Sequence, residues 1–292
     1  MKRLLKRIAA FVLVLSLAAG FCAVPDITVH ASSGDFVIDR DGVLTGYKGV
    51  GGEVAVPDGV VSIGEKAFAG CNSIVTVKLP SSVRSIGKSA FDSCNELTGI
   101  TLSGNLKSIG ENAFWGCKSL KNLRIPDSVT EIGFGAFCNC DSLNGIRLSK
   151  DVKKIGTYAF GFRFSGGYDR VNDFVIMGEK KSTASDYADK YEIPFITKDS
   201  LQTALTGVGK KSGKLTVKWK KNTKVSGYEI QYSTGSSFSG SGTRTITVRS
   251  GSKSTQTVKG IKSKTKYYVR IRGYRTIAGK KYYSAWSKAK KI

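Results

Sequence analysis

The sequence predicts a mostly β protein in two parts, a solenoid of short strands and turns followed by a small β-sandwich. A unit of 23 residues recurs five times between Val60 and Phe160, and a fixed period of roughly 20–50 residues is typical of solenoids. After Leu201, short alternating apolar runs are separated by Gly/Ser/Lys turns. Strands spaced by roughly 8–12 residues indicate a sandwich.

Each unit of the solenoid has the same order of small and apolar residues. It begins at an apolar position and has an Ile-Gly pair, an Ala-Phe pair and, in four units, a cysteine; an apolar pair two residues apart follows. That pair predicts a short strand with one face inward, and the Ile-Gly-x-x-Ala-Phe segment predicts a tight turn or one helical turn. One unit buries too little apolar surface to fold alone, so neighbours must stack.

The pattern V-x-x-I-G-x-x-A-F-x-x-C-x-x-L-x-x-[VIL]-x-[LI]-P resembles the BspA-type (Treponema-type) leucine-rich repeat of bacterial surface proteins, and residues 60–160 match it nearly throughout. The resemblance implies a secreted binding protein without a catalytic site. It leaves the ligand open, because the exposed positions of such repeats vary.

The first 31 residues read as a secretory signal peptide. Four basic residues precede the apolar run Ile8–Val24, and Val29–Ala31 supplies small residues before a cleavage site. An uncleaved membrane anchor is the alternative, disfavoured because the run is at or below the roughly 17–25 residues of a spanning helix. We therefore expect a secreted, possibly surface-associated protein with no stable membrane span. Cleavage would also remove His30, the only histidine.

The solenoid domain is predicted to span residues 32–200, with an atypical segment at each end. Residues 32–59 form the N-terminal cap, where Asp39–Gly42 favours a hairpin turn. After an insertion rich in glycine and aromatic residues at 161–170, a short helix over Ser182–Tyr191 with Ser182 at its N-cap and the apolar stretch Ile193–Ile196 close the other end. Such caps cover the open core of a solenoid.

Residues 201–292 are predicted to form the sandwich. The segments Leu215–Trp219, Gly227–Tyr232 and Thr265–Ile271 resemble a fibronectin type III domain, with Trp219 at that family's core tryptophan and Tyr267 at its tyrosine corner. The resemblance implies a spacer or adhesive module.

The charge of the chain is concentrated in this second domain. Of its ionisable side chains 22 are Lys or Arg and one, Glu229, is acidic, whereas residues 32–200 are neutral overall. Strand alternation turns the basic side chains on both outer faces outward. We predict polyanion binding there, with an anionic cell-wall polymer as partner and nucleic acid not expected after export; a solvated basic face is the alternative. The residues are Lys214, Lys218, Lys220, Arg270 and Arg272.

Five cysteines remain after cleavage: Cys71, Cys94, Cys117, Cys138 and Cys140. Rungs about 4.8 Å apart would permit disulfides by distance, but a small apolar residue also suits this core position. We favour buried free thiols. A structural zinc site needs four ligands in paired short spacings, and only Cys138 and Cys140 are close, so no metal is expected.

A ligand is expected on the outer face of the repeat strands, between their inward apolar residues. A solvated sheet face is the alternative. The aromatic residues Trp115 and Phe134, at positions where other units hold Asp92 or Lys88, predict either an exposed patch or packing near Cys138. The candidate ligand-binding residues are Lys78, Thr101, Asn122, Arg124, Arg147 and Trp115.

Catalysis is not expected. Without histidine no Ser-His-Asp or Cys-His arrangement can form, and the chain has neither a phosphate-binding loop nor a dinucleotide fingerprint. We predict a monomeric adhesion or recognition protein without cofactors, whose repeats bind an extracellular protein or glycan while the basic domain serves as spacer or wall attachment. The alternative is a cell-wall or polysaccharide-binding protein in which the solenoid is the spacer.

Overall fold

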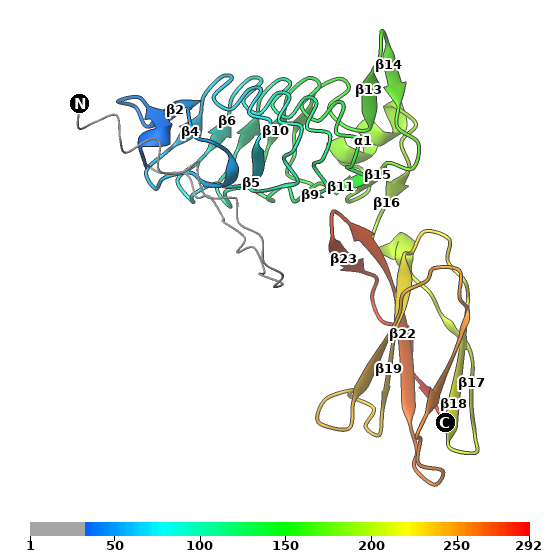
Figure 1. Cartoon of the computed structure of the whole chain (residues 1–292). Coiled ribbons are helices and arrows are strands. Elements are labelled where there is room, and N and C mark those ends of the chain that lie inside the picture. The colour runs from blue at the N-terminus through cyan, green and yellow to red at the C-terminus, as the bar shows by residue number, and fades with distance from the viewer. Residues whose placement is uncertain (1–32) are drawn as a thin grey trace, which may run out of the picture.

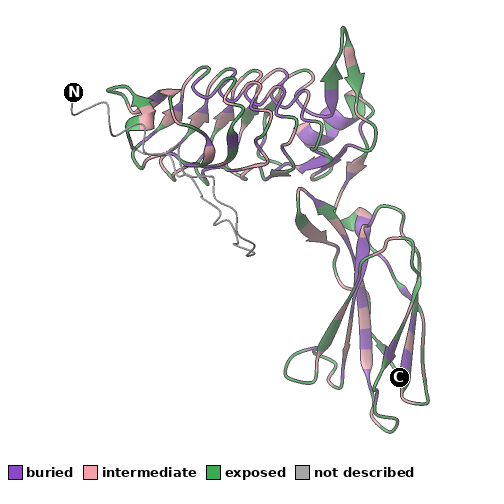
Figure 2. Ribbon diagram, in the orientation of Figure 1, coloured by how far each residue is buried: buried purple, intermediate pink, exposed green. Residues whose placement is uncertain are grey.

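The computed structural model describes residues 33–292, so the predicted signal peptide lies outside it. A solenoid runs across the upper part of Figure 1, and a β-sandwich extends from its C-terminal end. In Figure 2 the buried residues line the interior of the solenoid and the space between the two sheets of the sandwich.

The elements of the solenoid are as follows. They are η1 (Ser33–Asp35), β1 (Phe36–Ile38), β2 (Val43–Tyr47), β3 (Gly52–Ala55), β4 (Ser62–Ile63), β5 (Ile74–Lys78), β6 (Ser85–Ile86), β7 (Gly99–Thr101), β8 (Ser108–Ile109), β9 (Asn122–Leu123), β10 (Glu131–Ile132), β11 (Gly145–Arg147), β12 (Lys154–Ile155), β13 (Phe162–Phe164), β14 (Tyr168–Arg170), β15 (Val175–Met177), α1 (Thr183–Lys190) and β16 (Phe195–Ile196).

Two rows of strands run along the solenoid, parallel throughout except for the antiparallel pair of β1 and β2. The first has the order β3-β5-β7-β9 and is followed by β11-β15-β16; the second has the order β1-β2-β4-β6-β8-β10-β12. Within these sheets, strands of successive repeats pair in register, as Val77 does with Ile100 and Ile63 with Ile86. The second sheet is not predicted, because the sequence indicates only turns in this half of the repeat. Its strands are two residues long, too short to show an alternating pattern, and their hydrogen bonds come from neighbouring coils.

The Ala-Phe half of each repeat is a series of turns rather than a helix. Its backbone enters the left-handed region at Lys66, Ser89 and Asn112, with φ of 55°, 50° and 51°. The Ile-Gly glycine just before these turns lies against the preceding coil. A Cβ on Gly133 would stand 2.5 Å from the backbone nitrogen of Glu111, so only glycine fits without moving a coil.

The phenylalanines of the Ala-Phe pairs form a continuous stack through the core. Successive ring centroids from Phe68 to Phe160 lie 4.8–5.0 Å apart, with interplanar angles of 4–8°. Tyr47 of β2 covers the first ring at 5.2 Å. At the other end the Tyr187 hydroxyl accepts a hydrogen bond from the Phe160 N–H at 3.0 Å.

Both predicted caps are observed. Strands β1 and β2 form an antiparallel hairpin around Asp39–Gly42. Helix α1 begins after Ser182, whose hydroxyl accepts from the backbone N–H of Ser185 while the Ser185 hydroxyl accepts from that of Ser182. This reciprocal capping box satisfies two backbone donors at the helix start.

The five cysteines of the described residues are free thiols, and all except the half-buried Cys71 are buried, as predicted. Three of them extend the regularity of the core, because each donates to the carbonyl of a phenylalanine 26 residues earlier. These pairs are Cys94 with Phe68, Cys117 with Phe91 and Cys140 with Phe114, at Sγ–O distances of 3.0, 3.1 and 3.2 Å.

The second domain is a sandwich of two antiparallel sheets, β17-β18-β21 and β20-β19-β22-β23, with β24 paired to β22. The predicted Trp219 is buried, and the Tyr267 hydroxyl accepts from the Lys262 N–H at 3.4 Å, which confirms the tyrosine corner. The elements are η2 (Asp199–Leu201), β17 (Leu205–Lys211), β18 (Lys214–Trp219), β19 (Gly227–Ser233), β20 (Arg244–Val248), β21 (Thr255–Lys259), β22 (Tyr268–Ile277), β23 (Lys280–Tyr283) and β24 (Lys290–Lys291).

Candidate ligand-binding face

The outward positions of the first sheet align in rows across the repeats. The register pairs Ala55 with Lys78 and Lys78 with Thr101, and Arg124 follows one repeat later, directly after β9. Lys78, Thr101 and Arg124 are all exposed. The structure therefore brings these three predicted residues onto one face, here called the strand face. Asn122 lies on β9 and pairs with Gly99; its side chain is not among those described.

The strand face is hollowed along its length. A shallow groove of about 520 Å³ crosses β3, β5 and β7 and includes Lys78 and Thr101. At Ile100 and Thr101 it meets a larger cleft of about 750 Å³, which has Arg124, Pro126, Asp127 and Ser128 on the solenoid side. The opposite wall belongs to the second domain and consists of Ile277, Ala278, Gly279, Lys280 and Tyr282.

The second domain reaches the strand face because the outward positions of the last strands become apolar. Val175 and Met177 of β15 and Ile196 of β16 are buried within the hydrophobic cluster of the sandwich rather than that of the solenoid. Ile176, between the first two, faces the solenoid core. In Figure 1 the hairpin of β22 and β23 correspondingly lies beneath the C-terminal end of the solenoid.

Tyr282 marks the junction of the two domains. Burial raises the pKa of its hydroxyl, and the nearby Arg147 and Arg124 guanidinium groups lower it in part. Arg147 lies at a smaller pocket of about 400 Å³ that also contains Met177 and Tyr282. The Arg147 guanidinium forms an ion pair with Asp127, so these two charges offset one another beside the cleft.

Two cationic side chains of the cleft remain without a carboxylate partner. Within residues 33–292, neither Arg124 nor Lys280 takes part in an ion pair, and both are exposed. The Lys280 ammonium lies 5.7 Å from the centroid of the Tyr282 ring, within the distance of a cation–π contact. The cleft thus has a positive rim over a partly apolar floor.

Trp115 does not lie on the strand face. Its ring packs 6.0 Å from Phe164 and 6.3 Å from Tyr168, both of the β13–β14 hairpin, while Phe134 lies 5.9 Å from Tyr168. The hairpin projects from the opposite edge of the solenoid in Figure 1. Trp115 and Phe134 therefore pack against the aromatic residues of the insertion, a contact that the sequence does not predict.

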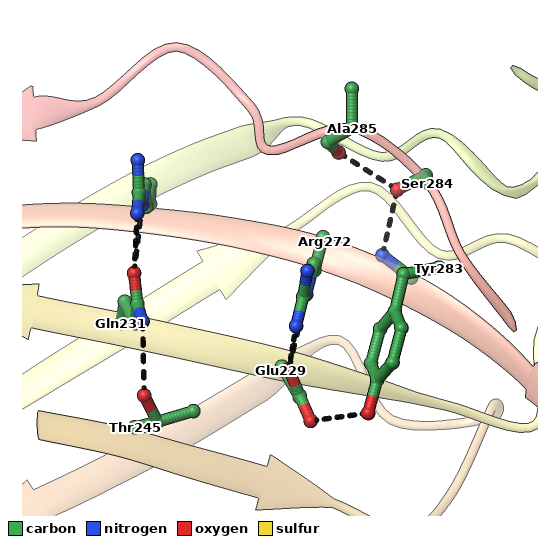
Figure 3. A network of polar contacts seen from close by, with 9 residues as sticks. Glu229, Gln231, Thr245, Arg272, Tyr283, Ser284 and Ala285 are labelled. Carbon is green, nitrogen blue, oxygen red and sulfur yellow. Dashed lines mark hydrogen bonds and ion pairs between the residues drawn. The ribbon is translucent and has the colours of Figure 1, made fainter. Parts of the chain in front are cut away.

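Arg270 and Arg272 on the second domain are less free than strand alternation predicted. The Arg272 guanidinium donates to one carboxylate oxygen of Glu229 at 2.7 and 3.0 Å, and the Tyr283 hydroxyl donates to the other at 2.9 Å (Figure 3). The guanidinium carbons of Arg270 and Arg272 also lie 4.7 and 4.3 Å from the Trp286 ring centroid. Both arginines lie on the outer face, as strand alternation predicts, but are half-buried between aromatic rings; their role in binding a polyanion stays a prediction.

The lysines predicted on the other sheet are placed as expected. Lys214, Lys218 and Lys220 are exposed, and the inward Leu215, Val217 and Trp219 between them are buried. Their role in binding a polyanion stays a prediction.

The described part of the chain, residues 33–292, contains no cluster of three or more His, Cys, Asp or Glu side chains arranged to hold a metal ion. In the same residues no helix has the length and apolar character needed to cross a membrane.

Sequence reasoning missed the wall of the cleft that β22 and β23 provide. Ala278 and Gly279 form the two-residue turn of this hairpin. Both have positive φ, 47° and 74°, as a type I′ hairpin turn requires. A signal for the contact was nevertheless present. The outward positions of β15 and β16 hold Val175, Met177 and Ile196, where the preceding repeats hold polar or small residues.

Comparison with known proteins matches both domains. The model of the BspA type leucine rich repeat region matches residues 52–163 in six copies, and that of the fibronectin type III domain matches residues 202–290. No curated protein matches the chain.

Several solved structures resemble the solenoid. A leucine rich repeat protein of T. pallidum is 37% identical over 51% of this chain and 71% of its own, with a TM-score of 0.46. A leucine-rich repeat protein from Bacteroides capillosus is 32% identical over 40% of this chain and 96% of its own, with a TM-score of 0.33. A leucine rich cell surface protein from Faecalibacterium prausnitzii is 24% identical over 52% and 45%, with a TM-score of 0.41.

Proposed function

Because this chain belongs to the proteins with BspA-type leucine-rich repeats, here joined to a fibronectin type III domain, we propose that it is a secreted or cell-surface adhesion protein. Both kinds of domain are typically binding or scaffold modules without catalysis, and BspA-type repeat proteins are typically secreted or found at the surface. The proposed ligand is an extracellular protein or glycan. The proposed export depends on the signal peptide in the first 31 residues.

The observation that carries this proposal is the hollowed strand face. Groove and cleft together extend from β3 to β9, and their edges hold the polar side chains of Lys78, Thr101 and Arg124. The inward apolar residues that fold the solenoid do not by themselves require a concave, partly polar outer surface. Ligand sites are commonly concave, with a few polar groups that fix orientation.

A large side chain in the middle of the groove tests the assignment. Thr101→Trp would fill the junction of groove and cleft, whereas Lys107→Trp places the same side chain on an exposed position next to the second sheet. Immobilised host matrix proteins and purified bacterial cell walls would serve as probes, with binding measured by surface plasmon resonance. We expect at least a tenfold loss for Thr101→Trp and little change for Lys107→Trp. Equal binding by both variants would show that the strand face is not the ligand surface.

A second function, attachment to an anionic wall polymer, is supported by the charge of the second domain. Its single acidic residue, Glu229, is already neutralised by Arg272, so the remaining exposed charges of residues 201–292 are all positive. Such attraction is screened as the Debye length falls from about 10 Å at 0.1 M salt to about 3 Å at 1 M. We expect the protein to bind purified cell walls at low salt and to elute as salt rises. Retention unchanged at about 1 M salt would contradict an electrostatic anchor.

A further inference from the structure

We infer that the cleft between the strand face and the β22–β23 hairpin is a composite site for an acidic polypeptide segment that also carries apolar side chains. The inference rests on the proposed function and specifies its ligand class. The cleft has one wall from each domain, with Thr101, Arg124 and Ser128 on one side and Ala278, Lys280 and Tyr282 on the other.

The sign of the ligand charge follows from the cleft's own charges. Arg124 and Lys280 are exposed and without ion-pair partners among the described residues, whereas the carboxylate of Asp127 is held by Arg147. The adjoining groove is lined by one cation, Lys78, and one carboxylate, Glu53, so the excess positive charge lies in the cleft itself. A ligand seated here meets unpaired positive charge, so a carboxylate-bearing segment is complementary. Like charges in the same place would be rejected.

The apolar part of the lining favours a polypeptide over a sugar or phosphate polymer. Pro126 on the solenoid and Ala278 and the Tyr282 ring on the hairpin line the cleft together with Ile100 and Leu102. Apolar and aromatic side chains can replace water on such a floor, and the core of a protein interface is typically enriched in them. A sulfated or phosphorylated polymer has the charge but no apolar side chains to fill this floor.

The composite construction has a consequence that a site within one domain would lack. A ligand that contacts Arg124 and Lys280 together binds only when the two domains are docked. Ligand and docking are therefore linked, because whatever binds only the docked form shifts the protein toward it. Each domain alone retains one wall and should bind weakly.

The test uses poly(Glu,Tyr), an acidic polypeptide with aromatic side chains, as a fluorescent probe at about 0.15 M salt. The cleft variant combines Arg124→Gln with Lys280→Gln. The control combines Lys107→Gln with Lys264→Gln, which removes the same charge from exposed positions on other parts of the two domains. Dextran sulfate, a polyanion without apolar side chains, is the second probe. Thermal melting of both variants verifies that the fold is intact.

We expect the Kd for poly(Glu,Tyr) to rise at least tenfold in the cleft variant and less than threefold in the control, while dextran sulfate shows equal, small changes with both. Equal shifts with poly(Glu,Tyr) would overturn the inference, as would a cleft-specific loss of dextran sulfate, which would assign the site to a polymer of another class. Either failure leaves the proposed function standing if Thr101→Trp still weakens binding to host matrix proteins or purified cell walls at least tenfold.

Discussion

A missing side chain at Gly133 decides how closely two coils of the solenoid approach. Its Cβ would lie 2.5 Å from the backbone nitrogen of Glu111, and one on Gly110 would lie 2.7 Å from the carbonyl carbon of Gly87. Both contacts are to backbone, which cannot swing away as a flexible side chain can. The glycine of the repeated Ile-Gly pair is therefore required by the close packing of neighbouring coils rather than by a turn.

Gly133→Ala should lower the free energy of unfolding by about 1–3 kcal/mol, as is typical of overpacking in a dense interior. Gly104→Ala is the matched control, since nothing lies within 4 Å of a Cβ there. Urea unfolding followed by circular dichroism measures both. Equal stability of the two variants would contradict the close approach.

The hydroxyl of Tyr187 should matter more than that of its neighbour Tyr191. Tyr187→Phe removes the acceptor of the buried Phe160 N–H, and an unsatisfied buried donor costs about 1–3 kcal/mol. The buried Tyr191 hydroxyl has no hydrogen-bond partner within the described part of the chain, so Tyr191→Phe should be neutral or stabilising. A comparison of the two melting temperatures decides; a larger loss for Tyr191→Phe would reverse the assignment.

Among elements, the strands of the first sheet and both caps could be predicted from sequence, because each leaves a local pattern. The pairs Val77/Leu79 and Leu123/Ile125 alternate, and Ser182 precedes a short amphipathic run. The strands of the second sheet could not be predicted. Ser62–Ile63 and its counterparts are too short for alternation, and their hydrogen bonds exist only once coils stack.

The raised pKa values of two cysteine thiols in the Ala-Phe half of the repeats predict how the stability of the protein changes at alkaline pH. Burial raises the pKa of Cys71 to about 11 and that of Cys138 to about 12, from an ordinary value of 9.0. Between about pH 9 and pH 11–12 the thiols therefore stay protonated in the folded state but lose their protons in the unfolded state. Their contribution to the free energy of unfolding is complete below about pH 9 and is lost as pH rises toward 11–12.

We expect the urea midpoint of the wild type to fall above about pH 9, with a smaller decline in Cys138→Ala. The difference between the two proteins isolates the thiol, because lysines and tyrosines titrate in both. Parallel declines from pH 8 to 10.5 would contradict a raised pKa at Cys138.

For the whole molecule, the docking of the second domain on the strand face is the feature that sequence reasoning did not supply. The sequence predicts the two domains separately, from the 23-residue period and from Trp219 and Tyr267. It also predicts Lys78, Thr101 and Arg124 on one face, because strand alternation is local. The opposite wall at Ala278–Tyr282 depends on a contact between segments more than 100 residues apart in sequence, which no local pattern encodes.

Met177→Glu should separate the domains while leaving each folded. Met177 is buried at the junction, and burial of an unpaired carboxylate costs several kcal/mol, whereas in the undocked form the side chain reaches water. We expect a larger radius of gyration by small-angle X-ray scattering with an unchanged circular dichroism spectrum. The control is Lys78→Glu, on the same face but in the groove of β3, β5 and β7, which no residue of the second domain lines. An unchanged radius for Met177→Glu would show that this contact does not hold the domains together.

The stacked glycines of the Ile-Gly pairs also restrict how the length of the solenoid can change, because regular coils fit one another only as whole units. Insertion or deletion of one whole 23-residue unit among the regular repeats returns every glycine, phenylalanine and cysteine to an equivalent neighbour. The longer coil that holds the β13–β14 hairpin, where Gly145 pairs with Val175, lies at the end of the regular stack. Each unit added before β7 moves the N-terminal cap outward by one strand spacing, about 4.8 Å, and leaves the cleft untouched. Natural variants in the number of regular repeats should therefore differ by multiples of 23 residues, and what they vary is the reach of the groove rather than its junction with the second domain.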